Sequence, residues 1–182
     1  DKDYAQDQLL KALLGISNIL RDMENYENAL FKVVEFTVNE TGAERGVLLL
    51  KVEGSDDLQI KSYYNCDTES LKDITDFSKS VVSEVAREVA PLVVSDALED
   101  KRTKKYKSIA QHNIRSVICM PIIAEGTFYG VLYLDHHTIP ALFGTYDITF
   151  VTSLTNFMSV ILNVLKRFKT VAISRDQYVK EL

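Results

Sequence analysis

The chain has 182 residues, of which 46% are hydrophobic and 26% charged, and its formal net charge is -5. This length fits one compact domain with flanking helices, and the negative charge argues against direct nucleic-acid binding, which relies on Lys and Arg neutralising phosphates. The two cysteines suggest neither a disulfide framework nor a zinc site, and the first residues lack the pattern of an export signal, so we expect a cytoplasmic location.

Apolar residues at helical spacing predict two helices before the first strand. In the first set, spacings of four and three alternate, as in the seam of a coiled coil or a bundle helix. Its members are Leu9, Leu13, Ile16, Leu20 and Met23. The second set lies within residues 30–38 and is followed by Gly42, which suits the left-handed position that closes a helix. We interpret residues 1–25 as a dimerisation and signalling helix.

The middle of the chain changes to strand patterns. Alternating apolar residues and β-branched runs, separated by turn residues, predict two hairpins and one short strand. The hairpins cover residues 47–64 and 116–135, and the short strand covers residues 91–94. Between them we expect a helix over residues 78–89, stopped by a proline, and a polar loop or short helix over residues 95–107.

One C-terminal segment has nearly the length of a membrane span but not its composition. Residues 148–165 contain no charged side chain and approach the ~20 residues that cross a bilayer. Ser, Thr and Asn residues interrupt the run, and its apolar stripe has helical spacing. The stripe consists of Leu154, Met158, Ile161 and Leu165. We expect a buried amphipathic helix from about Tyr146 past Phe168, with residues 166–182 as a signalling helix or linker, and no membrane partner.

The order of these elements predicts the fold class. Hairpins without regular alternation of strand and helix favour an α+β fold on a mainly antiparallel sheet. The strand at residues 128–134 is apolar at nearly every position, so both faces of the sheet should be covered. We expect the terminal helices on one face and the segment between the hairpins on the other.

Four motifs in this order resemble the GAF family. They are ETGAERGVLLL at residues 40–50, PLVVSD at residues 91–96, IRSVICMP at residues 114–121 and YGVLYLD at residues 129–135. The resemblance covers about residues 26–165 and is strongest to bacterial GAF domains that precede an output domain, such as those of σ54-dependent activators, adenylate cyclases and histidine kinases. It implies a six-stranded antiparallel sheet with a small-molecule pocket between the sheet and lid helices or loops in residues 74–116.

The resemblance also places candidate ligand-binding residues around this pocket. They are Asp96, Tyr106, His112, Arg115 and Ser116. These side chains would supply the few polar groups that a mostly apolar ligand site requires. The alternatives are that Asp96 caps the following turn, that Arg115 pairs with Asp96 or Glu99, and that His112 is a loop histidine. The sequence identifies no cofactor.

Two ligand classes and a metal are disfavoured. GAF domains that bind cyclic nucleotides carry an NK…F…DE signature, of which Phe143 and one acidic residue remain here. Bilin-binding members use a Cys followed by His, whereas Cys66 and Cys119 are followed by other residues. Neighbouring side chains on a strand point to opposite faces, so we expect His136 and His137 not to share a metal ion.

The sequence contains no P-loop, GxSxG, GxGxxG or HExxH motif, so we expect no catalytic activity. We interpret the chain as a regulatory domain that senses a small-molecule effector and controls an output domain, such as a transcription activator, a cyclase or a kinase, as a homodimer through its terminal helices. One alternative is a dimerisation scaffold whose pocket is filled by Ile114, Ile118 and aromatic side chains. The other is an enzyme like the GAF methionine sulfoxide reductases, which would use Cys119.

Overall fold

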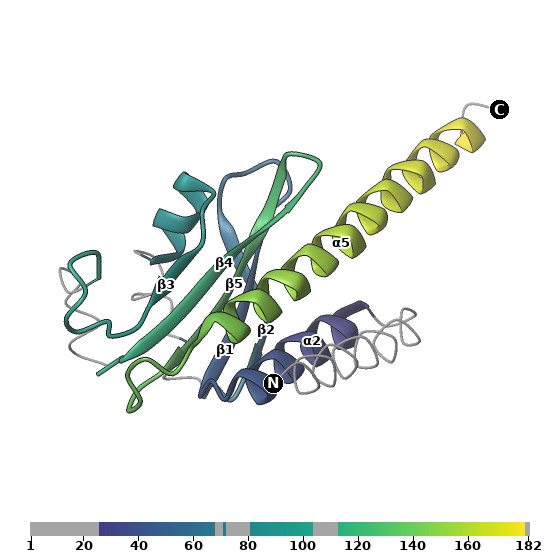
Figure 1. Ribbon diagram of the computed structural model, residues 1–182. Coiled ribbons are helices and arrows are strands. Elements are labelled where there is room, and N and C mark those ends of the chain that lie inside the picture. Colours follow the sequence, from purple (N-terminus) through teal and green to yellow (C-terminus); the bar gives the residue numbers. More distant parts are fainter. Residues whose placement is uncertain (1–25, 68–70, 72–80, 104–112, 181–182) are drawn as a thin grey trace.

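The computed structural model describes residues 26–67, 71, 81–103 and 113–180 (Figure 1). The N-terminal seam from Leu9 to Met23 therefore lies outside the described residues. The described elements are helix α2 (Tyr26–Thr41), strands β1 (Arg45–Lys51), β2 (Leu58–Tyr64), β3 (Leu92–Val94), β4 (Ser116–Ala124) and β5 (Thr127–His136), and helix α5 (Thr145–Lys180). Residues 81–88 are also helical.

The strands form an antiparallel sheet in the order β2-β1-β5-β4-β3. The α+β class, both predicted hairpins, the short strand and the long last helix are confirmed. The resemblance implied six strands, but the described residues contain five. The described part of residues 95–107 consists of turns, and residues 104–112 lie outside the described residues.

Two hydrophobic clusters cover the two faces of the sheet, as the apolar strand predicted. We call the face under α2 and α5 the helix face. Its buried side chains include Val34, Val38, Leu48, Ile118, Met120, Leu132, Leu134, Val151, Leu154 and Met158. We call the opposite face, which residues 81–88 and the loop after β3 cover, the second face. Its buried side chains include Val47, Val81, Val85, Leu92, Ile114, Val117, Cys119, Val131 and Tyr133.

Gly130 marks an irregularity in the alternation between these faces. On either side of it, Tyr129 packs on the helix face and Val131 on the second face, because the pairing of β4 with β5 shifts register here. Gly130 has a φ of 155°, and a Cβ at this position would clash with the carbonyl oxygen of Leu49 and lie 2.9 Å from the Cα atom of Leu50. Only glycine lets the backbones of β1 and β5 approach so closely.

Helix α5 packs on β4 through one side and continues beyond the sheet (Figure 1). Its 36 residues correspond to a length of about 54 Å at 1.5 Å per residue. Leu154 and Met158 of the predicted stripe are buried against the sheet, while Ile161 is half-buried and the neighbouring Val160 is 59% exposed. The prediction of an amphipathic helix is confirmed, and no described helix is long and apolar enough to span a bilayer.

Candidate functional site

The second face is the candidate site because it combines apolar strand residues with charged side chains at its margin. Val81, Val82 and Val85 of the helical segment 81–88 pack against β1, β4 and β5 there. Ile114 lies on this face, as the filled-pocket alternative required, but Ile118 lies on the helix face, so this part of that expectation is wrong.

Asp96 and Arg115 form an ion pair at the margin of the second face. The distance from Nη2 of Arg115 to Oδ2 of Asp96 is 2.5 Å, and both side chains remain partly exposed. Oδ1 of Asp96 also accepts a hydrogen bond of 3.2 Å from the backbone N–H of Leu98. The capping of a turn by Asp96 and its pairing with Arg115 are thus both confirmed. The Nε atom of Arg115 is buried without a hydrogen-bond partner among the described residues.

Ser116 lies on the other side of the sheet from this pair. It shares the alternation of Ile118 and Met120, which pack on the helix face. Its hydroxyl donates to the carbonyl oxygen of Ile139 at 2.7 Å and accepts from the backbone N–H of Leu142 at 3.2 Å. Ser116 therefore fixes the connection between β5 and α5, and its ligand-binding role stays a prediction.

Tyr106 and His112 lie outside the described residues. Of the five predicted ligand-binding residues, the structure brings together Asp96 and Arg115. The roles assigned to Tyr106 and His112 stay predictions.

A buried network that the sequence analysis did not identify lies at one end of the second face. Nε and Nη2 of Arg45 donate to the two carboxylate oxygens of Asp135 at 2.9 and 2.5 Å, and the Tyr133 hydroxyl donates to Oδ2 of Asp135 at 2.9 Å. Asp135 and Tyr133 are 0% exposed. The signal that could have found it is a charged residue at the start of one apolar strand and another at the end of a second.

The hydrogen bonds and the charge of Asp135 stabilise the charged form of Arg45. Burial alone would lower the pKa of Arg45, but the hydrogen bonds and charge of Asp135 outweigh it, so the pKa is raised. Burial, followed by the charge of Asp135, raises the pKa of Tyr133 well above its ordinary value. Arg45 therefore stays cationic and Tyr133 neutral at physiological pH, so this network acts as a fixed structural unit and not as a proton donor.

The Nδ1 atoms of both neighbouring histidines lie within 4 Å of the Glu44 carboxylate. Its Oε2 lies 3.0 Å from Nδ1 of His137 and 3.9 Å from Nδ1 of His136. The expectation that their side chains diverge is wrong, because β5 ends at His136 and His137 lies in the following bend. Partial burial would raise the pKa of Glu44, but its hydrogen bonds with His137 outweigh this and lower the pKa. Among the described residues, no group of three His, Cys, Asp or Glu side chains is arranged to hold a metal.

Both cysteines lie on the second face as free thiols. Burial raises the pKa of Cys66 to about 11, and complete burial also raises the pKa of Cys119. Since the thiolate is the nucleophilic form of cysteine, neither thiol is activated at physiological pH.

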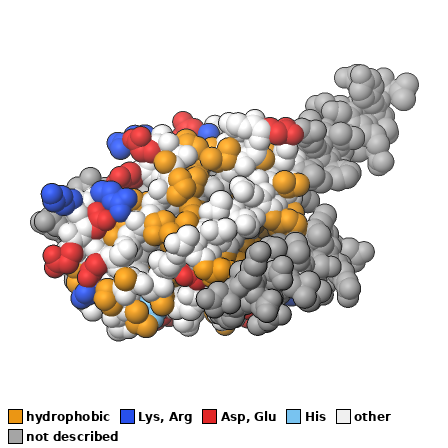
Figure 2. Space-filling model, in the orientation of Figure 1, with side chains coloured by type: hydrophobic (Ala, Val, Ile, Leu, Met, Phe, Trp, Pro, Cys, Tyr) orange, Lys and Arg blue, Asp and Glu red, His pale blue; other side chains and the backbone are white. Residues whose placement is uncertain are grey.

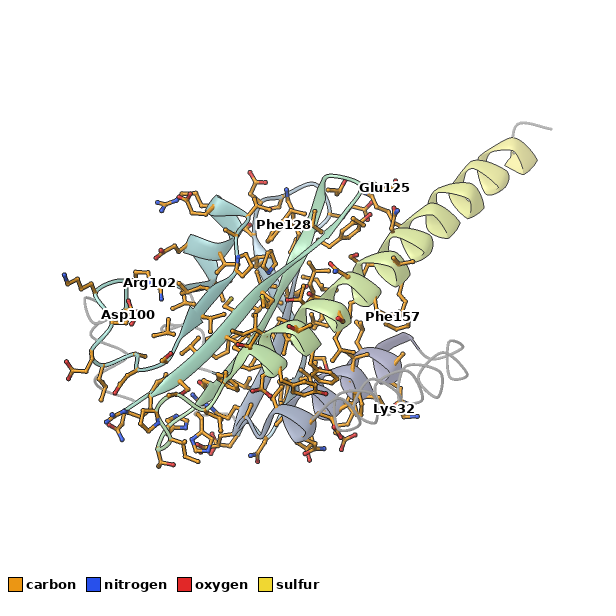
Figure 3. All side chains as sticks on the ribbon, in the orientation of Figure 1. Lys32, Asp100, Arg102, Glu125, Phe128 and Phe157 are labelled. Carbon is orange, nitrogen blue, oxygen red and sulfur yellow. The ribbon has the colours of Figure 1, made fainter. Side chains whose placement is uncertain are left out.

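Charged side chains gather at the end of the molecule that carries β3 and the following loop (Figure 2). Asp100 and Arg102 lie beside each other on this loop (Figure 3), with 2.7 Å between Nη2 of Arg102 and Oδ2 of Asp100. Nη2 of Arg102 also donates to the carbonyl oxygen of Val93 at 2.9 Å. The charge of Arg102 is thus paired with Asp100 within the loop.

The chain is similar to several known proteins. The family model of the GAF domain matches residues 25–162. A stretch of 64 residues, 35% of the chain, is 25% identical to hybrid signal transduction histidine kinase G of Dictyostelium discoideum and spans 2% of that protein's length.

Solved structures share the fold at low sequence identity. The GAF domain of a phosphoenolpyruvate-protein phosphotransferase from Coxiella burnetii has a TM-score of 0.68 and 15% identity, over 88% of this chain and 98% of that chain. The free methionine-R-sulfoxide reductase from Neisseria meningitidis has a TM-score of 0.62 and 19% identity, over 82% of this chain and 88% of that chain. At these identities the likeness concerns the fold.

Proposed function

Because the chain belongs to the GAF domain family, we propose that it is a cytoplasmic sensory domain that binds a small molecule on its second face and controls an output domain through its terminal helices. The output domain would be a transcription activator, a cyclase or a kinase, within a longer protein. The observation that carries this proposal is that different elements cover the two faces of the sheet. The two described terminal helices, α2 and α5, lie on the helix face, and a separate layer covers the second face.

The chemistry of the second face suits a small, mostly apolar ligand with an anionic group. Ligand sites combine an apolar lining with a few polar groups that fix orientation. The lining would come from valines of β1, β4 and β5. The buried Nε atom of Arg115, which has no described partner, would donate to the anionic group. The predicted contacts of Tyr106 and His112 would complete the site, and a cyclic nucleotide is disfavoured by the missing signature.

The terminal helices would act within a homodimer. Leu154 and Met158 already pack on the chain's own sheet, so a partner helix would contact a different side of α5. That side carries Val160, which is 59% exposed, and no charged residue between Ile148 and Asn163. Charged residues are depleted at the centre of protein interfaces, so the absence of charge on this side supports contact with a second copy.

The proposed role is regulatory and not enzymatic. Reduction of a sulfoxide by cysteine needs a thiolate that reaches the substrate, and the raised pKa values of Cys66 and Cys119 oppose this. Cys119 is moreover 0% exposed. Both observations support the regulatory role over a reductase role. Full methionine sulfoxide reductase activity that is lost on Cys119→Ser would overturn this part of the proposal.

Native mass spectrometry of the purified chain tests the proposal directly. We expect a dimer that carries a small-molecule mass. Cys119→Met, which enlarges a side chain on the second face, should remove that mass, whereas Met120→Leu, the adjacent residue on the helix face, should retain it. A monomer without a bound mass would contradict both ligand sensing and helix-mediated dimerisation.

A scaffold with a filled second face is the second candidate function. Val117, Cys119, Val131 and Tyr133 are each 0% exposed, so a ligand that contacts them must displace the covering layer. A stable dimer without any bound mass, unchanged by Cys119→Met, would favour this function over ligand sensing.

A further inference from the structure

We propose that the network of Arg45, Tyr133 and Asp135 couples the second face to the two helices on the opposite face. The inference rests on the proposed function, since it assigns the regulation of the ligand site on the second face. The three buried side chains are the positioning residues through which a displacement on that face reaches α2 and α5.

The ion pair lies where two strands meet the connections to the helices. Arg45 begins β1, directly after the connection from α2. Asp135 lies near the end of β5, directly before the connection to α5. The two residues are paired across the antiparallel strands β1 and β5. One ion pair therefore joins the start of β1, where the connection from α2 ends, to the end of β5, just before the connection to α5.

Hydrogen bonds around the pair extend this junction into both connections. The backbone N–H of Glu44 donates to the carbonyl oxygen of Asp135 at 2.8 Å, and the backbone N–H of His137 donates to Oε2 of Glu44 at 3.1 Å. The N–H of Arg115 donates to the carbonyl oxygen of His136 at 2.9 Å. A shift of Asp135 would therefore move residues that lead into both helices and into β4.

The network also reaches the middle of the second face. Tyr133 belongs to the second-face cluster and lies opposite Cys119 in the pairing of β4 with β5. Its hydroxyl donates to the same carboxylate oxygen that accepts from Nη2 of Arg45. A ligand or a changed side chain that displaces Tyr133 therefore acts on the ion pair through a single hydrogen bond.

The burial of the pair makes it a stiff connection. Arg45 is 6% exposed and Asp135 is 0% exposed, so separating them would leave a charge without water or a partner. A displacement that reaches Asp135 is then transmitted to Arg45 and not absorbed by breaking the pair. Packed interiors transmit strain in the same way.

Amide hydrogen exchange of the 182-residue chain tests this coupling without a ligand. Val131→Ala removes a methyl pair from the fully buried second face and serves as the perturbation. We expect it to accelerate exchange in the C-terminal turns of α2 and the first turns of α5 by about fivefold, the lower end of typical coupling between sites. In a Tyr133→Phe background, which lacks the hydroxyl link to Asp135, this acceleration should disappear.

Tyr129→Phe is the matched control. It removes another tyrosine hydroxyl from β5, one that donates to Oδ1 of Asn163 on the helix face at 3.0 Å. The effect of Val131→Ala on α2 and α5 should persist in this background. If Val131→Ala instead accelerates exchange throughout the chain, Val131→Ile, which adds volume at the same site, replaces it as the perturbation under the same criterion.

Equal acceleration of the helix ends with and without the Tyr133 hydroxyl, or acceleration confined to the second face, would overturn the inference. Because no ligand is used, that result would leave ligand sensing itself to the mass spectrometry. Conversely, the coupling can hold in a chain that binds no small molecule, so the two failures are distinguishable.

Discussion

Helix α2 on the helix face and the Asp135 network on the second face satisfy their buried polar groups in different ways. On the side of α2, the hydroxyl of Thr37 donates to the carbonyl oxygen of Val33 at 2.7 Å, so the bond lies within one helix. Thr41 repeats the pattern with the carbonyl oxygen of Thr37. On the second face, the carboxylate of Asp135 on β5 depends on Arg45 of β1.

This difference determines how each face responds to movement. Because the buried hydroxyls of α2 bond to carbonyl oxygens of α2 itself, this helix can shift against the sheet without losing those hydrogen bonds. A buried ion pair between strands loses much of its energy when the strands move apart, because both charges are desolvated. Helix α2 therefore suits movement as a rigid unit, and the second face suits the detection of small displacements.

Breaking the ion pair gives the largest expected effect. Asp135→Ala leaves the buried Arg45 without its partner and should lower the free energy of unfolding by about 3–5 kcal/mol, the usual cost of an orphaned buried charge. The double variant Arg45→Met with Asp135→Leu should recover most of this loss, because it leaves no buried charge. Urea unfolding followed by circular dichroism measures both, and a loss within about 1 kcal/mol for Asp135→Ala would contradict the importance of the pair.

Gly130→Ala would disturb the point at which the alternation between the two faces shifts. The new Cβ would clash with the carbonyl oxygen of Leu49, so β1 and β5 must separate. We expect a loss of about 3 kcal/mol in the same urea assay, toward the upper end of single-substitution effects. Gly54→Ala is the control, because Gly54 also has positive φ but a Cβ added there would meet nothing within 4 Å. Equal losses of unfolding free energy for the two variants would show that the positive φ, and not the close approach to Leu49, explains the need for glycine at position 130.

The sequence was sufficient for most of the fold because the relevant signals are local. The hairpins follow from alternating apolar residues and from turn residues such as Glu125 and Gly126, and both sets lie within a few residues of each other. The two-sided burial of β5 follows from its continuous apolar run. Once the strands are assigned, the remaining helical segments are the ones that must cover the two faces of the sheet.

The site was harder to predict because its signals are not local. The ion pair joins Arg45 and Asp135, which are 90 residues apart, and it depends on the register of β1 with β5. Alternation along β4 would have placed Ser116 with Ile118 and Met120, but only the packing shows that this side faces the helices. The Asp96 to Arg115 pair was accessible from sequence, because the two residues border adjacent strands.

Alkaline pH should destabilise the chain through the second face. The pKa of Cys66 is raised from 9.0 to about 11 in the folded state, mainly by burial. Below pH 9 the Cys66 thiol is protonated in both the folded and the unfolded chain, so its titration does not lower the free energy of unfolding there. Between about pH 9 and 11 the unfolded chain releases this proton while the folded chain retains it, so stability falls as pH rises.

Thermal unfolding between about pH 8 and 11 measures this dependence. Cys66→Ala should make the decrease in Tm with pH shallower, and the remaining slope includes Cys119 and Tyr133, whose pKa values are also raised. Met120→Leu on the helix face changes packing without changing titration and is the control. An unchanged slope for Cys66→Ala would show that the thiol does not distinguish the folded from the unfolded state.

The residues that follow two helices, one on each face, give the smallest expected effect and the most closely matched comparison. Helix α2 is followed by Gly42 with φ of 66°, whereas the helical segment 81–88 over the second face is followed by Val89 with φ of 51°. A residue with a Cβ in this left-handed conformation carries a strain of about 1–2 kcal/mol, and glycine avoids it because it has no Cβ. Val89 is 43% exposed, so its removal sacrifices little packing.

Exchanging the two residue types should therefore have opposite effects. Val89→Gly should raise the free energy of unfolding by about 1 kcal/mol, or Tm by about 3 °C for a chain of this size, because the strain disappears. Gly42→Val should lower stability by a similar amount, since a Cβ there meets nothing within 4 Å and the penalty is conformational alone. If Val89→Gly instead lowered Tm, the valine would contribute packing that outweighs its strained backbone. The two helix ends would then no longer distinguish the faces, and the contrast between the faces would rest on the ion pair alone.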